Sequence, residues 1–147
     1  MKLASTQYTL KYKSFEIYVS GCREHPCSGC HAVELWDETV GKEFNESLYN
    51  SIRHKIVTNI DMIDNLFILG GEPLEKPKEE VLELIKFLQQ FGKPIWLFTR
   101  FEKDNVNPEI LKELDYIKTG MYLKNSTSII EEGIELASSN QKVIKLK

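Results

Sequence analysis

Apolar residues recur along the chain in short uninterrupted runs, of a length typical of buried strands. The clearest runs, at Phe15–Val19, Leu66–Leu69 and Ile95–Phe98, are rich in aromatic and branched side chains. Weaker runs predict three more strands, the first of them at a sheet edge: residues 3–12, 116–119 and 143–146. The pattern therefore predicts strands distributed over the whole chain.

Apolar residues at helical spacing separate these strands. Leu48, Ile52 and Ile56 fall on one face of a helix that we expect to begin near Asn45 and to end near Ile56. Asn45 is a favourable N-cap residue, because its side-chain oxygen can accept a hydrogen bond from an unpaired backbone N–H. The spacing predicts an amphipathic helix between the first two clear strands.

Further helices are predicted downstream. One begins near Pro77, a residue suited to a first helical turn, and ends at Gly92. Its apolar stripe consists of Val81, Leu84, Ile85, Leu88 and Phe91. Another helix opens at Asn107-Pro108, and residues 131–136 predict a short helix with ordinary surface charge.

Strands that alternate with helices form βα units and a mainly parallel sheet. A closed barrel of eight such units needs about 250 residues, whereas this chain has 147. We therefore expect an α/β fold, a partial, open βα barrel formed by a single domain over residues 1–147.

Composition and charge narrow the functional classes. The net charge is −3, so the charge does not indicate a nucleic-acid partner. No apolar segment is long enough for a membrane span or typical of a signal peptide. The three cysteines are an odd number and lie in one short loop, which argues against disulfides and for metal binding in a reducing compartment. We therefore expect a cytoplasmic protein without a membrane partner, in an anaerobic metabolism that protects an air-sensitive metal centre.

Cys22, Cys27 and Cys30 follow the predicted strand Phe15–Val19 with the spacing C-x4-C-x2-C. Three thiolates on one short loop can hold three irons of a cubane [4Fe–4S] cluster and leave the fourth iron open to a substrate. We therefore predict a reactive iron–sulfur centre with these cysteines as its metal ligands.

A structural zinc site is the alternative, with His25 or His31 as a fourth ligand beside the cysteines. Zinc modules usually have a second ligand pair further along the chain. Here no cysteine follows Cys30, and the remaining histidine, His54, lies on a predicted helix. Ligand type and spacing favour iron–sulfur, and a non-enzymatic, zinc-stabilised binding module stays open as the rival.

Two other loops follow predicted strands directly. Gly70–Pro73 comes after one strand and Thr99 after the next. Glycine lets the backbone lie close to a ligand, and Glu72 offers a carboxylate to a ligand ammonium group. Because parallel strands end at one rim, we expect these loops to meet the cysteine loop there. The charged residues of 100–104 predict a solvated loop instead.

Together, the clustered cysteines after the first strand and the GGEP turn after the second resemble the radical S-adenosylmethionine enzymes. The resemblance implies a [4Fe–4S] cluster whose open iron is chelated by the amino and carboxylate groups of the methionine moiety of S-adenosylmethionine. One-electron cleavage of a carbon–sulfur bond then gives a 5′-deoxyadenosyl radical. In such enzymes the cofactors perform the difficult chemistry, and the protein positions them and excludes side reactions.

A narrower resemblance is to the activating proteins of anaerobic ribonucleoside-triphosphate reductase. It rests on landmarks that occur in the family's order: residues 19–22, 27–31, 35–37, 70–74, 94–99 and 138–141. The resemblance implies an oxidoreductase that generates a glycyl radical on the large subunit of the reductase, with a flavodoxin or ferredoxin as electron donor. An activase of another glycyl radical enzyme, or a radical S-adenosylmethionine enzyme that acts on a small molecule, stays open as an alternative.

The same resemblance assigns residues to the two cofactors. Cys22, Cys27 and Cys30 are implied as cluster ligands. The residues implied to bind S-adenosylmethionine are Gly29, Cys30, His31, Gly70, Gly71, Glu72 and Thr99. No further residue is expected to be catalytic, and Asn140 and Gln141 are assigned no role beyond fixing the last turn.

Overall fold

The computed structural model describes residues 1–24 and 26–147, so His25 and its expected part in a zinc site lie outside the described residues. The strands are β1 (Lys2–Thr9), β2 (Ser14–Val19), β3 (Lys42–Glu43), β4 (Asn65–Gly70), β5 (Ile95–Phe98), β6 (Tyr116–Thr119), β7 (Ile129–Glu131), β8 (Ile134–Leu136) and β9 (Lys142–Lys145). The α-helices are α1 (Glu46–Thr58), α2 (Lys78–Gln89) and α3 (Pro108–Leu111). Short 3₁₀ helices cover Val33–Leu35, Ile60–Met62, Pro73–Glu75 and Lys103–Asn105.

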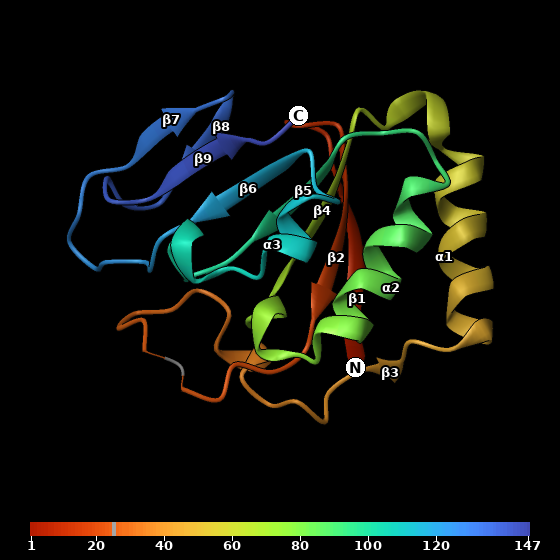
Figure 1. Cartoon of the computed structure of the whole chain (residues 1–147), viewed down its shortest axis with the longest axis horizontal. Helices are drawn as coiled ribbons and strands as arrows, with labels where there is room; N and C mark the ends of the chain where they lie inside the picture. The colour runs from red at the N-terminus through yellow and green to blue at the C-terminus, as the bar shows by residue number, and fades with distance from the viewer. Residues whose placement is uncertain (25) are drawn as a thin grey trace.

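A seven-stranded sheet forms the centre of the molecule, in the order β3-β1-β2-β4-β5-β6-β9 (Figure 1). Its four central strands, β2, β4, β5 and β6, run parallel. The flanking strands β1, β3 and β9 pair antiparallel. The α/β class and the parallel centre are confirmed. The sheet is open, with β3 and β9 at its edges, and its description as a partial barrel stays a prediction.

The main core lies between the sheet and the helices. Ile17, Ile68, Leu97 and Ile117 stand side by side across the four parallel strands, and each is fully buried. The apolar stripes of α1 and α2 pack onto this row. Removal of this apolar surface from water is the largest favourable contribution to the stability of the layer.

The two long helices begin and end close to where their spacing predicts. The Asn45 side chain accepts a hydrogen bond from Leu48 N at 3.1 Å and so caps α1. Pro77 occupies the cap position before α2, not its first turn. Gly92 follows α2 with φ of +66°, a left-handed conformation that glycine adopts without strain.

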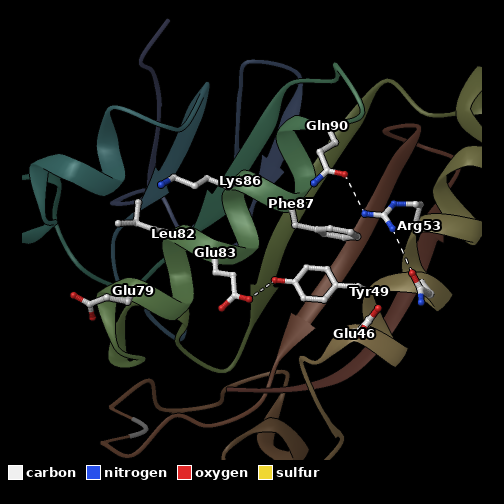
Figure 2. Close-up of a pocket in the computed structure, with 10 residues that line it drawn as sticks. Glu46, Tyr49, Arg53, Glu79, Leu82, Glu83, Lys86, Phe87 and Gln90 are labelled. Carbon is white, nitrogen blue, oxygen red and sulfur yellow. Dashed lines mark hydrogen bonds between the residues drawn. The ribbon is translucent and has the colours of Figure 1, made fainter.

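A groove of about 720 Å³ runs between α1 and α2. Figure 2 shows Tyr49 of α1 directed at Glu83 of α2, and Arg53 directed at Gln90, to which it donates at 3.1 Å. The Arg53 guanidinium also lies 5.5 Å from the centre of the Phe87 ring. The residues that line the groove come from α1, α2 and the residue after α2, so these contacts join the two helices.

The face opposite the helices is covered by a β-hairpin, and here the prediction of a short helix over residues 131–136 is wrong. The segment contains the end of β7, a two-residue turn and β8. Glu132 and Gly133 both have positive φ, at 49° and 79°. Such turns match the twist of the paired strands and therefore favour a hairpin.

The hairpin is held by a second apolar cluster. Ile134 and Leu136 of β8 pack against Phe67 and Trp96, which project from β4 and β5 away from the helices. Residues two apart share one face of a strand, so this spacing buries both side chains in the hairpin. The hairpin therefore covers the part of this face that Phe67 and Trp96 form.

The remaining differences from the predicted elements are small. α3 has four residues, and Leu114 reaches the core from beyond its end. β1 ends at Thr9, and the short strand β3, which the apolar pattern does not predict, takes the outer edge. Among the residues that the structure describes, none of the helices has the length and apolar character needed to cross a bilayer.

Candidate functional site

A cavity of about 140 Å³ opens at the carboxyl ends of the parallel strands. The three cysteines line it, and so do the turn Gly70–Glu72 after β4 and the pair Thr99-Arg100 after β5. The structure thus brings together the three loops that follow β2, β4 and β5. This convergence is what parallel strands that end at one rim require.

The cysteine loop starts where β2 ends. Cys22 is buried, and its backbone N–H donates to Trp36 O at 3.1 Å, which fixes the base of the loop. Cys27 and Cys30 are half-buried and are joined by a turn in which Cys30 N donates to Cys27 O at 3.2 Å. The Cys30 sulfur accepts a bond from Ala32 N at 3.4 Å. None of the three thiols is in a disulfide.

A cubane cluster and a single metal ion need different arrangements of three thiols. The ligands of a zinc ion converge on one point, and within residues 1–24 and 26–147 no three Cys, His, Asp or Glu side chains do so. In a [4Fe–4S] cluster each cysteine binds a different iron, so thiols spread around one cavity suit it. The donor set fits the predicted cluster.

Two glycines bring the turn after β4 against the end of β2. A Cβ on Gly70, where φ is +126°, would lie 2.3 Å from Val19 O. A Cβ on Gly71 would lie 2.2 Å from Gly21 O. Neither position accepts a side chain, because real Cβ atoms do not approach backbone oxygens so closely. The glycine pair is therefore what lets this turn lie beside the cysteine loop.

Glu72 and Thr99 join the ends of β4 and β5. Glu72 Oε1 accepts hydrogen bonds from Thr99 Oγ1 at 2.7 Å and from Leu74 N at 3.1 Å, and Oε2 accepts one from Arg100 N at 2.9 Å. Burial raises the pKa of Glu72, and these bonds oppose the shift. The Thr99 hydroxyl also accepts from Phe101 N at 3.1 Å. Both side chains line the cavity and already have protein partners.

Two of the expected cofactor residues lie beside the cavity and not on its lining. Gly29 forms a turn with φ of +74° near the Lys124 side chain. His31 is exposed, and its ring centre lies 4.9 Å from that of Tyr122, which lines the cavity. The other five expected residues, Cys30, Gly70, Gly71, Glu72 and Thr99, line the cavity. The cofactor contacts of Gly29 and His31 stay predictions.

Arg100 does not belong to a solvated loop, and the prediction for residues 100–104 is wrong at this position. Its side chain is only 13% exposed and lines the cavity. Its Nη2 donates to Glu75 at 2.7 Å and to Glu24 at 3.2 Å. Because Arg100 N also binds Glu72, the backbone turns inward here, while the charged residues 102–104 remain exposed.

Lys118 on β6 is a second cation of the cavity that the apolar pattern did not mark. Its ammonium group donates to Gly120 O at 3.1 Å and to Thr99 O at 3.4 Å. Burial lowers the pKa of Lys118 to about 8, against the opposing charges of Glu72 and Cys27. The alternation of side chains along β6 could have indicated this position. Ile117, the neighbour of Lys118, packs in the core on one face of the strand, so Lys118 lies on the other face.

The segment 138–141 positions the loop that follows β6. Gln141 is buried, lines the cavity and donates from Nε2 to Gly120 O at 3.2 Å. Asn140 donates to Met121 O at 2.8 Å. Ser138 N donates to Gln141 Oε1 at 3.2 Å. These bonds fix the wall of the cavity as well as the last turn.

Comparisons with known proteins show which family and which proteins the chain is similar to. A family model described as "4Fe-4S single cluster domain" matches residues 13–144. The chain is 27% identical over 141 residues to the anaerobic ribonucleoside-triphosphate reductase-activating protein of Escherichia coli (strain K12), covering 89% of this chain and 87% of that protein. It is 26% identical over 106 residues to the Salmonella typhimurium protein of the same name, covering 69% and 67%. The resemblance to these activating proteins is thereby confirmed, and no solved structure matches the chain.

Proposed function

Because the chain belongs to the family of 4Fe-4S single cluster domains, we propose that it is a radical S-adenosylmethionine activase for anaerobic ribonucleoside-triphosphate reductase. The relatives supply the reaction class, since their names state that they activate this reductase. The observation that carries the proposal is the single cavity shared by the three cysteines and the Gly70–Glu72 turn.

Cys22, Cys27 and Cys30 would hold the cluster. Their thiols line one cavity, and each can serve a different iron. The cluster would supply the electron that cleaves S-adenosylmethionine to methionine and a 5′-deoxyadenosyl radical. The protein's own contribution is to fix the base of the loop through the Cys22–Trp36 backbone bond and so to position the thiols around the cavity.

The cofactor's methionine end would lie against Gly70, Gly71 and Glu72. The glycines let this turn lie against the end of β2 and the start of the cysteine loop, which places its backbone at the cavity. Glu72 still has acceptor capacity, since a carboxylate has about four lone-pair sites and three are used by Thr99, Leu74 and Arg100. Thr99, Gly29 and His31 complete the set that the resemblance implies, in a partial barrel that a partner would close.

A protein substrate suits this chain better than a small molecule. In the described residues, 1–24 and 26–147, the sheet, the α-helices and the hairpin β7-β8 leave the cavity open at the carboxyl ends of the strands. The partner would then seal the cavity against water and side reactions. We propose the glycyl-radical-bearing large subunit of the reductase as that partner, with a flavodoxin or ferredoxin as the electron donor in the cytoplasm.

The first test is cluster assembly followed by cofactor cleavage. The full chain is reconstituted anaerobically with iron and sulfide, reduced with dithionite and mixed with S-adenosylmethionine. We expect thiolate-to-iron absorbance, stoichiometric iron and release of 5′-deoxyadenosine. Cys27→Ser should lose cleavage, whereas Ser28→Ala, a matched change at the exposed neighbour, should keep it. Full cleavage by Cys27→Ser, or stoichiometric zinc without iron uptake, would refute the cluster assignment.

The second test identifies the target. The reduced, reconstituted protein is mixed with S-adenosylmethionine and the large subunit of an anaerobic ribonucleotide reductase, and electron paramagnetic resonance is recorded. A glycyl doublet that requires all three components supports the proposal. If cofactor cleavage is intact but the doublet forms only on a different glycyl radical enzyme, the chemistry stands and the proposed partner is wrong.

A further inference from the structure

Arg100 connects three segments that surround the cavity. Its guanidinium forms ion pairs with Glu75, in the turn after β4, and with Glu24, in the cysteine loop. Glu75 in turn accepts a hydrogen bond from Arg23 N at 2.8 Å, so the loop is attached through its backbone as well. Through its own N–H, Arg100 also binds Glu72. The side chain is thus fixed from several directions.

The guanidinium is fixed in a largely buried place. The side chain is 13% exposed, its Nε is buried without a hydrogen-bond partner in the described part of the chain, and its centre lies 4.2 Å from the Phe101 ring centre. Charges in such surroundings act more strongly than charges in water. An arginine keeps its proton at every accessible pH, so Arg100 is a permanent positive charge at this site.

The positive charge of Arg100 lies at the cavity that the three cysteines line. Arg100 lines the cavity together with the cysteines, whereas Glu75 and Glu24 do not line it. Burial lowers the pKa of Arg100, but hydrogen bonds to Glu75 and Cys22 and the nearby carboxylates outweigh it and raise the pKa. Arg100 and Cys22 therefore line the same cavity, whereas the two carboxylates that pair with the guanidinium do not.

We infer that Arg100 is a positioning residue for the cluster: it holds the cysteine loop and, by its charge beside Cys22, makes the cluster easier to reduce. The inference rests on the proposed function, because it needs the cluster to be present. Reduction adds one electron to the cluster, and a nearby cation stabilises the more negative form. Hydrogen bonds to the ligand sulfurs and local charge are among the factors that set the potential of such clusters.

The test is a redox titration of the reconstituted full chain, without S-adenosylmethionine. Cluster reduction by dithionite is followed by electron paramagnetic resonance and visible absorbance at known potentials. We compare Arg100→Gln, which removes the charge, with Arg100→Lys, which keeps it. Arg53→Gln, in the groove of Figure 2, is the matched control because it removes an arginine remote from the cysteines.

For Arg100→Gln, we expect the ratio of reduced to oxidised cluster at the wild-type midpoint to fall about tenfold, a shift of about 59 mV for a one-electron couple. Arg100→Lys should change the ratio by less than about threefold. This corresponds to less than half of the free-energy difference expected for Arg100→Gln. Arg53→Gln should titrate like the wild type. If Arg100→Gln binds the full amount of iron and titrates like the wild type, the inference is wrong.

Glu75→Gln provides a second, independent test with the opposite sign. It keeps an oxygen that can accept from Arg23 N but removes the negative charge that offsets Arg100. The cluster should then become easier to reduce, with a ratio several-fold above the wild type. A shift in the same direction as Arg100→Gln, or no shift, would overturn the inference even if Arg100→Gln does not fold. Failure of the wild type to bind iron would instead refute the proposed function.

Discussion

Replacing Lys118 with methionine removes an ammonium group that is largely buried between the ends of β5 and β6. Methionine has a similar length and no charge, so it can occupy the same space. The replacement also removes the hydrogen bonds to Gly120 O and Thr99 O. The loss of these bonds shifts the overall stability, whereas the loss of the titrating charge changes how stability depends on pH.

The magnitude follows from the lowered pKa of Lys118. A pKa of about 8, compared with 10.5 for an unperturbed lysine, corresponds to about 3 kcal/mol of penalty on the charged form in the folded protein. Below pH 8 the group is protonated in both the folded and the unfolded chain, so the whole penalty is present. Between pH 8 and pH 10.5 the folded chain loses this proton first, and stability rises with pH.

The assay is urea unfolding of the full chain without iron, under anaerobic reducing conditions, at several pH values from 7 to 9.5. Relative to Lys118→Met, the wild type should gain about 2 kcal/mol in free energy of unfolding over this range. Lys103→Met serves as the matched control, because it removes an exposed ammonium group from the neighbouring loop. Parallel pH profiles for the wild type and Lys118→Met would refute the reasoning.

Two further predictions concern the buried contacts that shape the site. Thr99→Val should lower the free energy of unfolding by about 1–3 kcal/mol in urea titrations, because the buried Glu72 carboxylate loses one of its donors; a loss below about 0.5 kcal/mol would show that this bond is not needed. Ile134→Ala should cost about 2–5 kcal/mol, whereas Ile130→Ala on the exposed side of the same hairpin should stay within about 0.5 kcal/mol. Equal losses for the two isoleucine variants would contradict the packing of β8 on the sheet.

The elements that were predicted correctly are those whose burial is regular. β5 and β6 begin and end as their apolar runs predict, and the stripe beginning at Val81 places α2 on the core. In each of these, one face is buried along the whole element, so the spacing of apolar residues reports the structure directly. The regular apolar runs also predicted parallel strands. Because parallel strands end at one edge of the sheet, the three loops were expected to meet there.

The hairpin was missed because residues 131–136 are too few for spacing to separate a helix from a strand. Ile134 and Leu136 are two apart, which is strand spacing, but this signal occurs only once. The decisive feature is the turn at Glu132-Gly133, where both residues have positive φ. Glutamate disfavours that conformation, so the sequence does not mark the turn in the way that an Asn-Gly pair would.

The two cations were missed for a different reason. Arg100 and Lys118 carry charged side chains, for which exposure is the usual outcome. Their burial depends on tertiary contacts, namely the ion pair of Arg100 with Glu75 and the bond from Lys118 to Thr99 O. The alternation along β6 indicates only which face of the strand Lys118 is on, and the sequence pattern does not report these distant partners.

These cations connect the stability of the chain to its proposed chemistry. Burying Lys118 lowers its pKa, which is a cost to folding that a core of apolar residues would avoid. A protein keeps such a cost where function needs the charge. Iron-ligating cysteines are thiolates, and Arg100 and Lys118 line the same cavity as the three cysteines. The pH profile of Lys118→Met therefore measures what one buried charge of the cavity costs the fold, and the redox titration of Arg100→Gln measures what another contributes to the proposed cluster.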